Sequence, residues 1–273
     1  MKTKTIWTAS VCALYTVALA ATGAWAGQLQ IKGSTTVLPI AQKVADPFMK
    51  AHSDVKLSIS GGGSGNGIKA LIDQATDIAM ASRAMKDKEV ALAKEKGVEP
   101  MAHEIAYDCI VPVVHPDNPV TDISMDQLKE IYMGKITNWK DLGGPDMEVV
   151  VISRDTSSGT YEVWESKVMD KERVYPGALL QASNGAVVQA VSKNKNAVGY
   201  IGYGYMDETT KGLTVNGVEG KPETALNGEY PVSRALYLYT QGESEGDVKS
   251  FIDFVLSADG QALVKEAGFV PLK

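Results

Sequence analysis

Residues 149–169 read VVVISRDTSSGTYEVWESKVM, an apolar run that ends in an arginine and is followed by small hydroxyl residues. The continuous apolar run predicts a strand covered on both faces of a sheet. The aromatic-bearing stretch after Gly159 predicts an amphipathic helix. A strand, a turn rich in Ser and Thr, and a helix form the repeating unit of α/β proteins. The turn itself is compatible with either a nucleophile or a cradle for an anion.

The same alternation of strand and helix runs along the whole chain. Runs with period two or continuous apolar character predict strands at residues 28–32, 55–60, 77–82, 109–115, 147–153, 197–203 and 235–240. Apolar residues at helical spacing predict helices at residues 37–50, 67–75, 86–97, 124–134 and 246–257. The pattern therefore predicts the α/β class, with mostly parallel sheets.

The first 26 residues have the features of a cleavable signal peptide. Lys2 and Lys4 form a basic start, residues 6–21 are apolar, and Ala24-Trp25-Ala26 fits the small-x-small cleavage pattern. The apolar run is shorter than the roughly 20 residues that a membrane-spanning helix requires. We therefore expect a soluble protein that is exported.

Charge and cysteine content exclude several classes of function. Two of the 27 basic residues lie in the predicted leader, so 25 basic residues face 33 acidic ones and the mature net charge is −8. Nucleic acid and anionic membranes are unsuitable partners for such a chain. Removal of the leader takes Cys12 away and leaves only Cys109, so no internal disulfide or cysteine metal site is expected. The three histidines are scattered, and we expect no metal and no cofactor.

Three predicted helices begin in the same way after a strand. They open on GSTT at residues 33–36, GGGSGNG at 61–67 and SSGT at 157–160. A helix N-terminus has unpaired N–H groups and a partial positive charge, and glycine allows close approach of the backbone. In open α/β sheets such turns lie at the carboxyl ends of strands, where ligands bind. Helix capping explains any one turn alone, but three turns with an adjacent arginine favour a shared anion site.

Enzyme interpretations have less support. Neither Ser64 nor Ser158 stands in a G-x-S-x-G motif, because Asn66 and Thr160 occupy the last position. A P-loop requires Gly-Lys-Ser/Thr, which the glycine-rich segment at residues 61–67 does not supply. We therefore expect a binding protein and not an enzyme.

Several segments together resemble the phosphate-binding proteins of bacterial ABC-type phosphate importers. In chain order they are IKGSTTVLPIAQKVADPFMK, SGGGSGNGIKALI, DIAMASR, QLKEIYMGKITNWKDLGG, ISRDTSSGTYEVW and AVGYIGYGY. The resemblance covers nearly the whole mature chain, and GKITNW and RDTSSGT are its most specific parts.

The resemblance implies a two-lobed type II periplasmic binding protein, with the ligand in the cleft between the lobes. Two crossover strands, near Tyr107–Cys109 and Ala235–Tyr237, would link the lobes as a hinge. Lobe 1 would consist of residues 27–107 plus 237–273, and lobe 2 of residues 108–236. Ligand binding would close the cleft.

The resemblance also implies which residues bind the anion. They are Thr35 and Thr36 in the first turn, Ser64 in the second, and Arg154, Ser158, Gly159 and Thr160 in the third. Arg154 would neutralise charge, hydroxyl groups would donate, and the N–H groups of Thr36 and Gly159 would complete the cage. Ser34 and Ser82 are neighbours that we include in the site.

The sequence departs from the family pattern at two positions. Some members place a carboxylate where this chain has Arg83, and that carboxylate accepts the proton of hydrogen phosphate and so excludes sulfate. Arg83 could be a second guanidinium on the anion or could point to solvent. Asp108 and Asp155 are candidates for the missing acceptor, and Asp108 at the predicted crossover is the better placed. Thr156 replaces a carboxylate that can steady the binding arginine, a role that Asp155 could take.

We therefore expect a monomeric periplasmic receptor for inorganic phosphate that delivers its ligand to the membrane permease of an ABC transporter. One alternative is a receptor for another tetrahedral oxyanion, such as sulfate. A second alternative is a phosphoryl-transfer enzyme on the same anion site.

Overall fold

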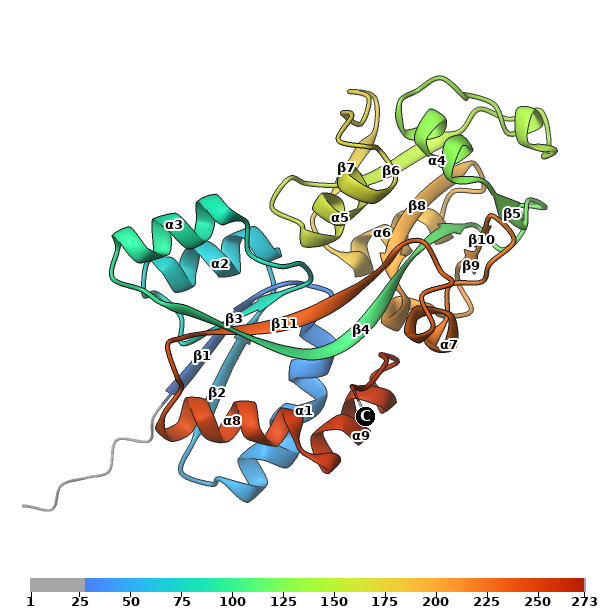
Figure 1. The fold of residues 1–273 in the computed structure, drawn as a ribbon. Helices are drawn as coiled ribbons and strands as arrows, with labels where there is room; N and C mark the ends of the chain where they lie inside the picture. The colour runs from blue at the N-terminus through green and yellow to red at the C-terminus, as the bar shows by residue number, and fades with distance from the viewer. Residues whose placement is uncertain (1–27, 273) are drawn as a thin grey trace, which may run out of the picture.

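The computed structural model describes residues 28–272, so the predicted signal peptide at residues 1–26 lies outside the described residues. The elements form two lobes joined by two long strands (Figure 1). No helix within residues 28–272 is long and apolar enough to cross a membrane.

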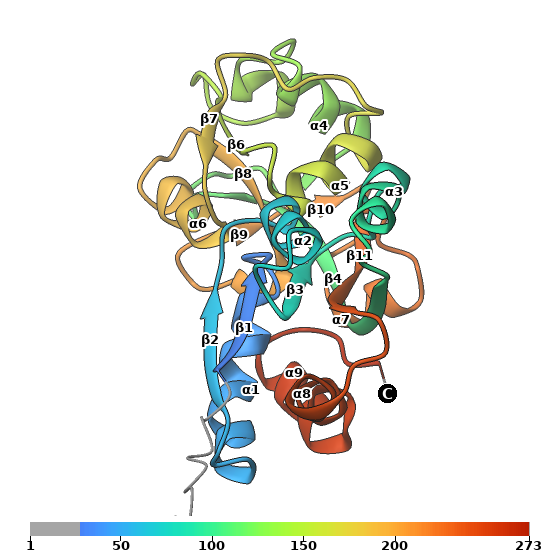
Figure 2. The ribbon, with the colours of Figure 1, turned by 90° about the vertical axis from the view of Figure 1, so that its left-hand side faces the viewer.

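Lobe 1 has a sheet with helices on both faces. Strand β1 (Gln28–Gly33) lies between β2 (Lys56–Ser60) and β3 (Ile78–Ala81), and both pairings are parallel. In β1 the side chains of Leu29 and Ile31 are buried, as period two requires. The helices of this lobe are α1 (Leu38–Ala51), α2 (Ser64–Ile72), α3 (Asp87–Glu95), α8 (Gly246–Leu256) and α9 (Ala258–Glu266). Figures 1 and 2 place α1, α8 and α9 on one face of the sheet, and α2 and α3 on the other.

Lobe 2 repeats the architecture. Strand β6 (Val150–Arg154) pairs in parallel with β7 (Leu179–Gln181) and β8 (Ala197–Gly202). Its helices are α4 (Met125–Tyr132), α5 (Gly159–Lys167), α6 (Asn184–Ser192) and α7 (Pro222–Leu226), with short 3₁₀ turns η1 (Trp139–Leu142) and η2 (Tyr203–Tyr205). The short strands are β5 (Asp122–Ile123), β9 (Lys211–Gly212) and β10 (Thr214–Val215).

Strands β4 (Pro100–Val114) and β11 (Ser233–Gln241) run through both lobes (Figure 1). They pair antiparallel with each other, and β4 continues from Ile110 along β8 in lobe 2. The sheet order is β2-β1-β3-β11-β4-β8-β6-β7. The expectation of mostly parallel sheets is therefore only partly right, because the two connecting strands run in opposite directions and pair antiparallel with their neighbours.

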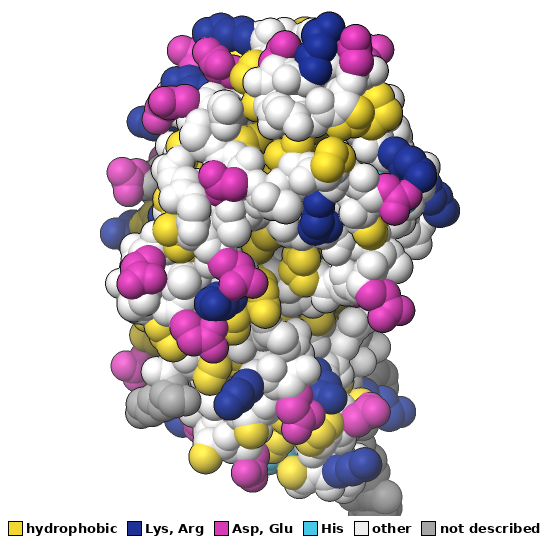
Figure 3. All heavy atoms as spheres, turned by 90° about the vertical axis from the view of Figure 1, so that its right-hand side faces the viewer, with side chains coloured by type: hydrophobic (Ala, Val, Ile, Leu, Met, Phe, Trp, Pro, Cys, Tyr) yellow, Lys and Arg dark blue, Asp and Glu magenta, His cyan; other side chains and the backbone are white. Residues whose placement is uncertain are grey.

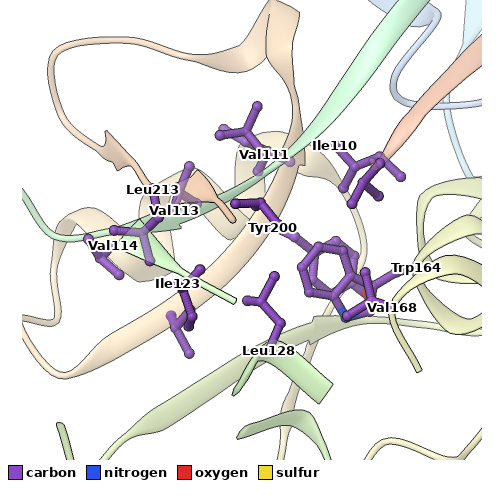
Figure 4. Packing of buried hydrophobic residues seen from close by; sticks show 14 of the residues in the cluster. Ile110, Val111, Val113, Val114, Ile123, Leu128, Trp164, Val168, Tyr200 and Leu213 are labelled. Carbon is purple, nitrogen blue, oxygen red and sulfur yellow. The ribbon is translucent and has the colours of Figure 1, made fainter. Parts of the chain in front are cut away.

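The two lobes have separate clusters of buried apolar residues. One cluster contains Ile31, Phe48 and Phe251, and a separate cluster contains Trp139, Trp164 and Tyr200. Figure 4 shows part of the second cluster, where Trp164 of α5 lies against Tyr200 of β8. Those rings stack with centroids 4.3 Å apart. Helix α5 and its N-terminal turn are therefore held firmly to the lobe 2 sheet.

The exact residues at which the lobes divide stay a prediction.

Acidic and basic side chains are interspersed on the face that Figure 3 shows. That face has no extended region of one sign.

Candidate functional site

The three predicted helix starts meet where the two lobes face each other. Within lobe 1, the N–H of Gly63 donates to the carbonyl of Gly33 at 2.9 Å and so joins the first turn to the second. Across the lobes, the N–H of Gly65 donates to the carbonyl of Ser157 at 2.9 Å. The described conformation therefore has its lobes in contact, with the three turns at the contact.

The first turn depends on Gly33. Its φ is 137°, and a Cβ built there would lie 2.2 Å from the carbonyl oxygen of Met80, so only glycine fits. After it, Ser34 Oγ accepts hydrogen bonds from the N–H groups of Thr36 (3.1 Å) and Val37 (3.4 Å). Ser34 is therefore a cap of the turn before α1. In this conformation the Thr36 N–H donates to Ser34, and its contact with the ligand stays a prediction.

The hydroxyl groups of the first turn face lobe 2. Thr36 Oγ1 and Thr160 Oγ1 are 3.0 Å apart and both residues are buried. Asn184, at the start of α6, donates from Nδ2 to Thr35 Oγ1 (3.2 Å) and to Thr36 Oγ1 (3.0 Å). Hydroxyls from both lobes thus come together in one buried polar cluster.

The second and third turns also approach closely. Ser64 Oγ accepts from the N–H of Ser82 at 3.0 Å and lies 3.2 Å from Ser82 Oγ. A Cβ at Gly159 would lie 2.3 Å from Ser64 Oγ and 2.7 Å from Ser82 Oγ, so the first residue of α5 has to be glycine where the helix meets lobe 1. Ser158 caps α5, since its Oγ accepts from the N–H of Tyr161 at 3.2 Å. Its hydroxyl hydrogen is still available for a ligand.

Arg154 at the end of β6 carries the charge of the third turn. It is 1% exposed, and burial lowers the pKa of its guanidinium, which nevertheless stays charged. Nε donates to the carbonyl of Gln181 (3.0 Å), and Nη2 donates to the carbonyl of Ala182 (3.1 Å) and to Thr35 Oγ1 (3.4 Å). Nη1 is buried and has no hydrogen-bond partner among residues 28–272. A buried charged donor without an acceptor is a strong indication of an anionic ligand.

The guanidinium of Arg154 is steadied by backbone carbonyls. Asp155, which we considered for that role, accepts from the N–H of Ser157 at 2.9 Å and from the hydroxyl of the same residue. Its carboxylate therefore stabilises the turn itself.

Arg83 takes neither of the two positions considered from the sequence. It is 7% exposed, and its guanidinium contacts two carboxylates. Nη1 and Nη2 donate to the two oxygens of Glu89 in α3 at 2.7 and 2.8 Å. Nη2 and Nε also contact Glu162 of α5, the former at 3.3 Å, and Lys86 Nζ lies 3.2 Å from Glu162. Arg83 thus belongs to an ion cluster that joins lobe 1 to lobe 2.

Asp108 also has a partner that the sequence interpretation missed. Arg234 of β11 lies opposite it in the register of the two long strands. Nε and Nη2 of Arg234 donate to Asp108 Oδ2 at 3.1 and 2.8 Å, and the N–H of Tyr203 donates to Oδ1 at 2.9 Å. Burial raises the pKa of Asp108 and lowers that of Arg234, and the charge of each opposes the shift in the other.

Two signals in the sequence could have revealed the missed residues. Arg234 and Asp108 are opposite charges beside the two predicted crossovers, each next to an apolar strand. Asn184 opens a fourth helix behind a strand, in the segment SNGA at residues 183–186, as the three recognised turns do.

The site has the composition of a binding cage. Hydroxyl, amide and guanidinium groups supply donors, and the residues come from both lobes. Within residues 28–272, no group of three or more His, Cys, Asp or Glu side chains is placed to hold a metal ion.

Comparison with known proteins places the chain in a family. A family model described as PBP superfamily domain matches residues 19–259. The phosphate-binding protein PstS of Staphylococcus epidermidis is 36% identical over 258 residues, which cover 89% of this chain and 78% of that protein. PstS of Bacillus subtilis is 32% identical, with coverage of 90% and 81%.

Solved structures agree. A substrate-binding protein from Clostridium perfringens with bound phosphate superposes with a TM-score of 0.85 at 38% identity, covering 90% of this chain and all of that one. An ABC-type phosphate transport receptor from Vibrio cholerae gives a TM-score of 0.73 at 31% identity, with coverage of 89% and 99%. The two-lobed fold and the resemblance noted in the sequence are thereby confirmed, and the chain belongs to the PstS family of phosphate-binding proteins within the PBP superfamily.

Proposed function

We propose that this protein captures inorganic phosphate between its lobes and delivers it to the membrane permease of an ABC transporter. The observation that carries the proposal is the buried Nη1 of Arg154, which has no acceptor among residues 28–272 and belongs to a guanidinium whose Nη2 donates to the Thr35 hydroxyl of the other lobe. The names of the relatives support it, because they are phosphate-binding proteins and a phosphate transport receptor.

The proposed ligand set contains seven residues. They are Thr35, Thr36, Ser64, Arg154, Ser158, Gly159 and Thr160. Hydroxyls and N–H groups would replace the hydration of the anion, and Arg154 would compensate its charge in a site closed to water. Micromolar affinity requires about 8 kcal/mol, and hydrogen bonds to a charged group contribute roughly 1.5–3 kcal/mol each. A few such bonds therefore suffice without any metal.

The place of action follows from the same proposal. A receptor that hands its ligand to a permease works outside the cytoplasmic membrane, which agrees with the signal peptide expected at residues 1–26. We further propose that the protein acts as a monomer, with residues 27–107 plus 237–273 in one lobe and residues 108–236 in the other.

Titration calorimetry with phosphate and with sulfate tests the function. We expect phosphate to bind with micromolar or tighter affinity and sulfate to bind far more weakly. Arg154→Ala should abolish tight binding and leave the fold intact, as circular dichroism would verify. Exposed Arg173 supplies the matched control, since Arg173→Ala removes the same charge and should leave the affinity unchanged. Equal affinity for both anions would favour a general oxyanion receptor, and retained affinity in Arg154→Ala would remove that residue from the site.

A further inference from the structure

The Asp108–Arg234 pair is buried at the junction of the two lobes. The side chains are 0% and 3% exposed, and they come from the two strands that connect the lobes. Removing two charges from water is costly, and an ion pair in this setting does not stabilise a fold more than apolar residues of the same size would. The position of the Asp108–Arg234 pair beside the proposed ligand residues therefore suggests a role in phosphate binding.

All five N–H groups of the Arg234 guanidinium have acceptors. Besides the two bonds to Asp108, Nη2 donates to Thr36 Oγ1 at 3.1 Å, and Nη1 donates to Thr160 Oγ1 at 3.0 Å and to the carbonyl of Ser82 at 3.4 Å. Thr36 and Thr160 belong to different lobes and are both in the proposed ligand set. One guanidinium thus contacts a ligand hydroxyl from each side of the cleft.

These contacts fix the direction in which the two hydroxyls can donate. Guanidinium is only a donor, so both hydroxyl oxygens must accept from it. Thr36 Oγ1 also accepts from Asn184 Nδ2, which uses its remaining lone pair. Each hydroxyl then has one hydrogen to give. One can bridge the 3.0 Å between the two oxygens, and the other is left for the anion.

We infer that Arg234 is a positioning residue of the anion site: held by Asp108, it orients the two hydroxyls so that Thr36 donates to Thr160 and Thr160 donates to phosphate, and it brings a second positive charge beside Arg154. The inference rests on the proposed function and deepens it. Asp108 then acts through Arg234, and the proton of hydrogen phosphate is accepted elsewhere. The proximity of the two arginines is consistent with this, because after burial the charge of Arg234 is among the causes that lower the pKa of Arg154.

The central variant is the double substitution Asp108→Asn/Arg234→Gln. It removes both charges and keeps similar shapes, whereas Arg234→Gln alone leaves a buried carboxylate without its partner and endangers folding. We expect the double variant to fold and to bind phosphate about 10- to 100-fold more weakly in calorimetry, the loss of one or two charge-assisted contacts. Unchanged phosphate affinity would overturn the inference.

A double-mutant cycle with Thr160→Val separates a positioning role from a structural one. The quantity to compare is the factor by which Thr160→Val weakens phosphate binding. If Arg234 acts by orienting that hydroxyl, this factor should be at least about threefold smaller in the Asp108→Asn/Arg234→Gln background than in the wild type. Equal losses in both backgrounds would mean that Arg234 only stabilises the fold.

Asp108→Asn alone tests how the carboxylate acts. We expect weaker phosphate binding with an unchanged ratio of phosphate to sulfate affinity. A ratio that falls several-fold would show that Asp108 accepts the ligand proton itself and would overturn this part of the inference. Failure of the wild-type protein to bind phosphate is a distinct result, because it removes the proposed function before any variant is compared.

Discussion

Glu162 offers a test of how the lobes are held together, through the substitution Glu162→Gln. Its carboxylate is 11% exposed and reaches across from α5 to Arg83 and Lys86 of lobe 1. A two-lobed receptor releases its ligand by separating the lobes, so this contact exists only in the closed form. In the open form water solvates the charges, and the substitution costs little there.

The expected magnitude follows from the cluster. Glutamine keeps an oxygen that accepts a hydrogen bond but loses the charge, while Arg83 keeps its two bonds to Glu89. Lys86 is 42% exposed, so its contact with Glu162 is screened and contributes little. The closed form should therefore lose about 1–2 kcal/mol relative to the open form, which corresponds to about 5- to 30-fold weaker phosphate binding.

Calorimetry should measure the affinity, and stopped-flow with a fluorescent reporter should show that faster dissociation accounts for most of the change. Glu165→Gln is the matched control, because Glu165 lies on the same helix and accepts from Tyr161 at 3.1 Å within lobe 2. It should bind as the wild type does. Affinity within twofold of the wild type in Glu162→Gln, or an equal loss in both variants, would refute the role of this cluster in closure.

Three further outcomes are expected. Gly159→Ala should weaken phosphate binding about tenfold or more in calorimetry, because its Cβ would lie 2.3 Å from Ser64 Oγ and overpacked contacts are costly; wild-type affinity would show that the turns can separate freely. Burial raises the pKa of Cys109 to about 12, so the native thiol should resist Ellman's reagent at pH 8 and react only after denaturation; rapid labelling of folded protein would contradict this. Hydrogen bonds from Lys69 and Lys96 lower the pKa of Asp73 from 3.8 to about 2. The contribution of the Asp73 carboxylate to the free energy of unfolding should therefore be complete above pH 3.8 and be lost as the pH falls towards 2. An Asp73 titration midpoint near pH 3.8 in NMR would show that these hydrogen bonds do not form.

Much of the fold could be predicted because its signals are local. The apolar run before Arg154 forms β6, and the hydroxyl-rich turn after it starts α5, as the pattern of residues 149–169 indicates. The directions in which the strands pair were harder to predict from the sequence. Whether β4 and β11 run parallel to their neighbours depends on how the chain crosses between lobes, and no spacing within either strand records that.

The site was predictable to the extent that each turn carries its own ligand groups. The sequence could not predict which of these polar groups already have hydrogen-bond partners within the protein. The hydroxyl of Ser34 accepts a hydrogen bond from the N–H of Thr36, and the carboxylate of Asp155 accepts one from the N–H of Ser157. Both hydrogen bonds depend on the backbone geometry within the turns. The roles assigned to the seven ligand residues stay a prediction until phosphate is seen bound.

By itself, the sequence determined the α/β class, the three helix starts and the arginine at the end of a strand, because backbone preference and side-chain periodicity act over a few residues. Only the tertiary structure decided the partners of the charges. Arg83 meets Glu162, and Asp108 meets Arg234, across 79 and 126 residues of chain. Burial makes such pairing obligatory, since a charge without a partner is too costly in the interior, but which partner is chosen depends on where the lobes meet.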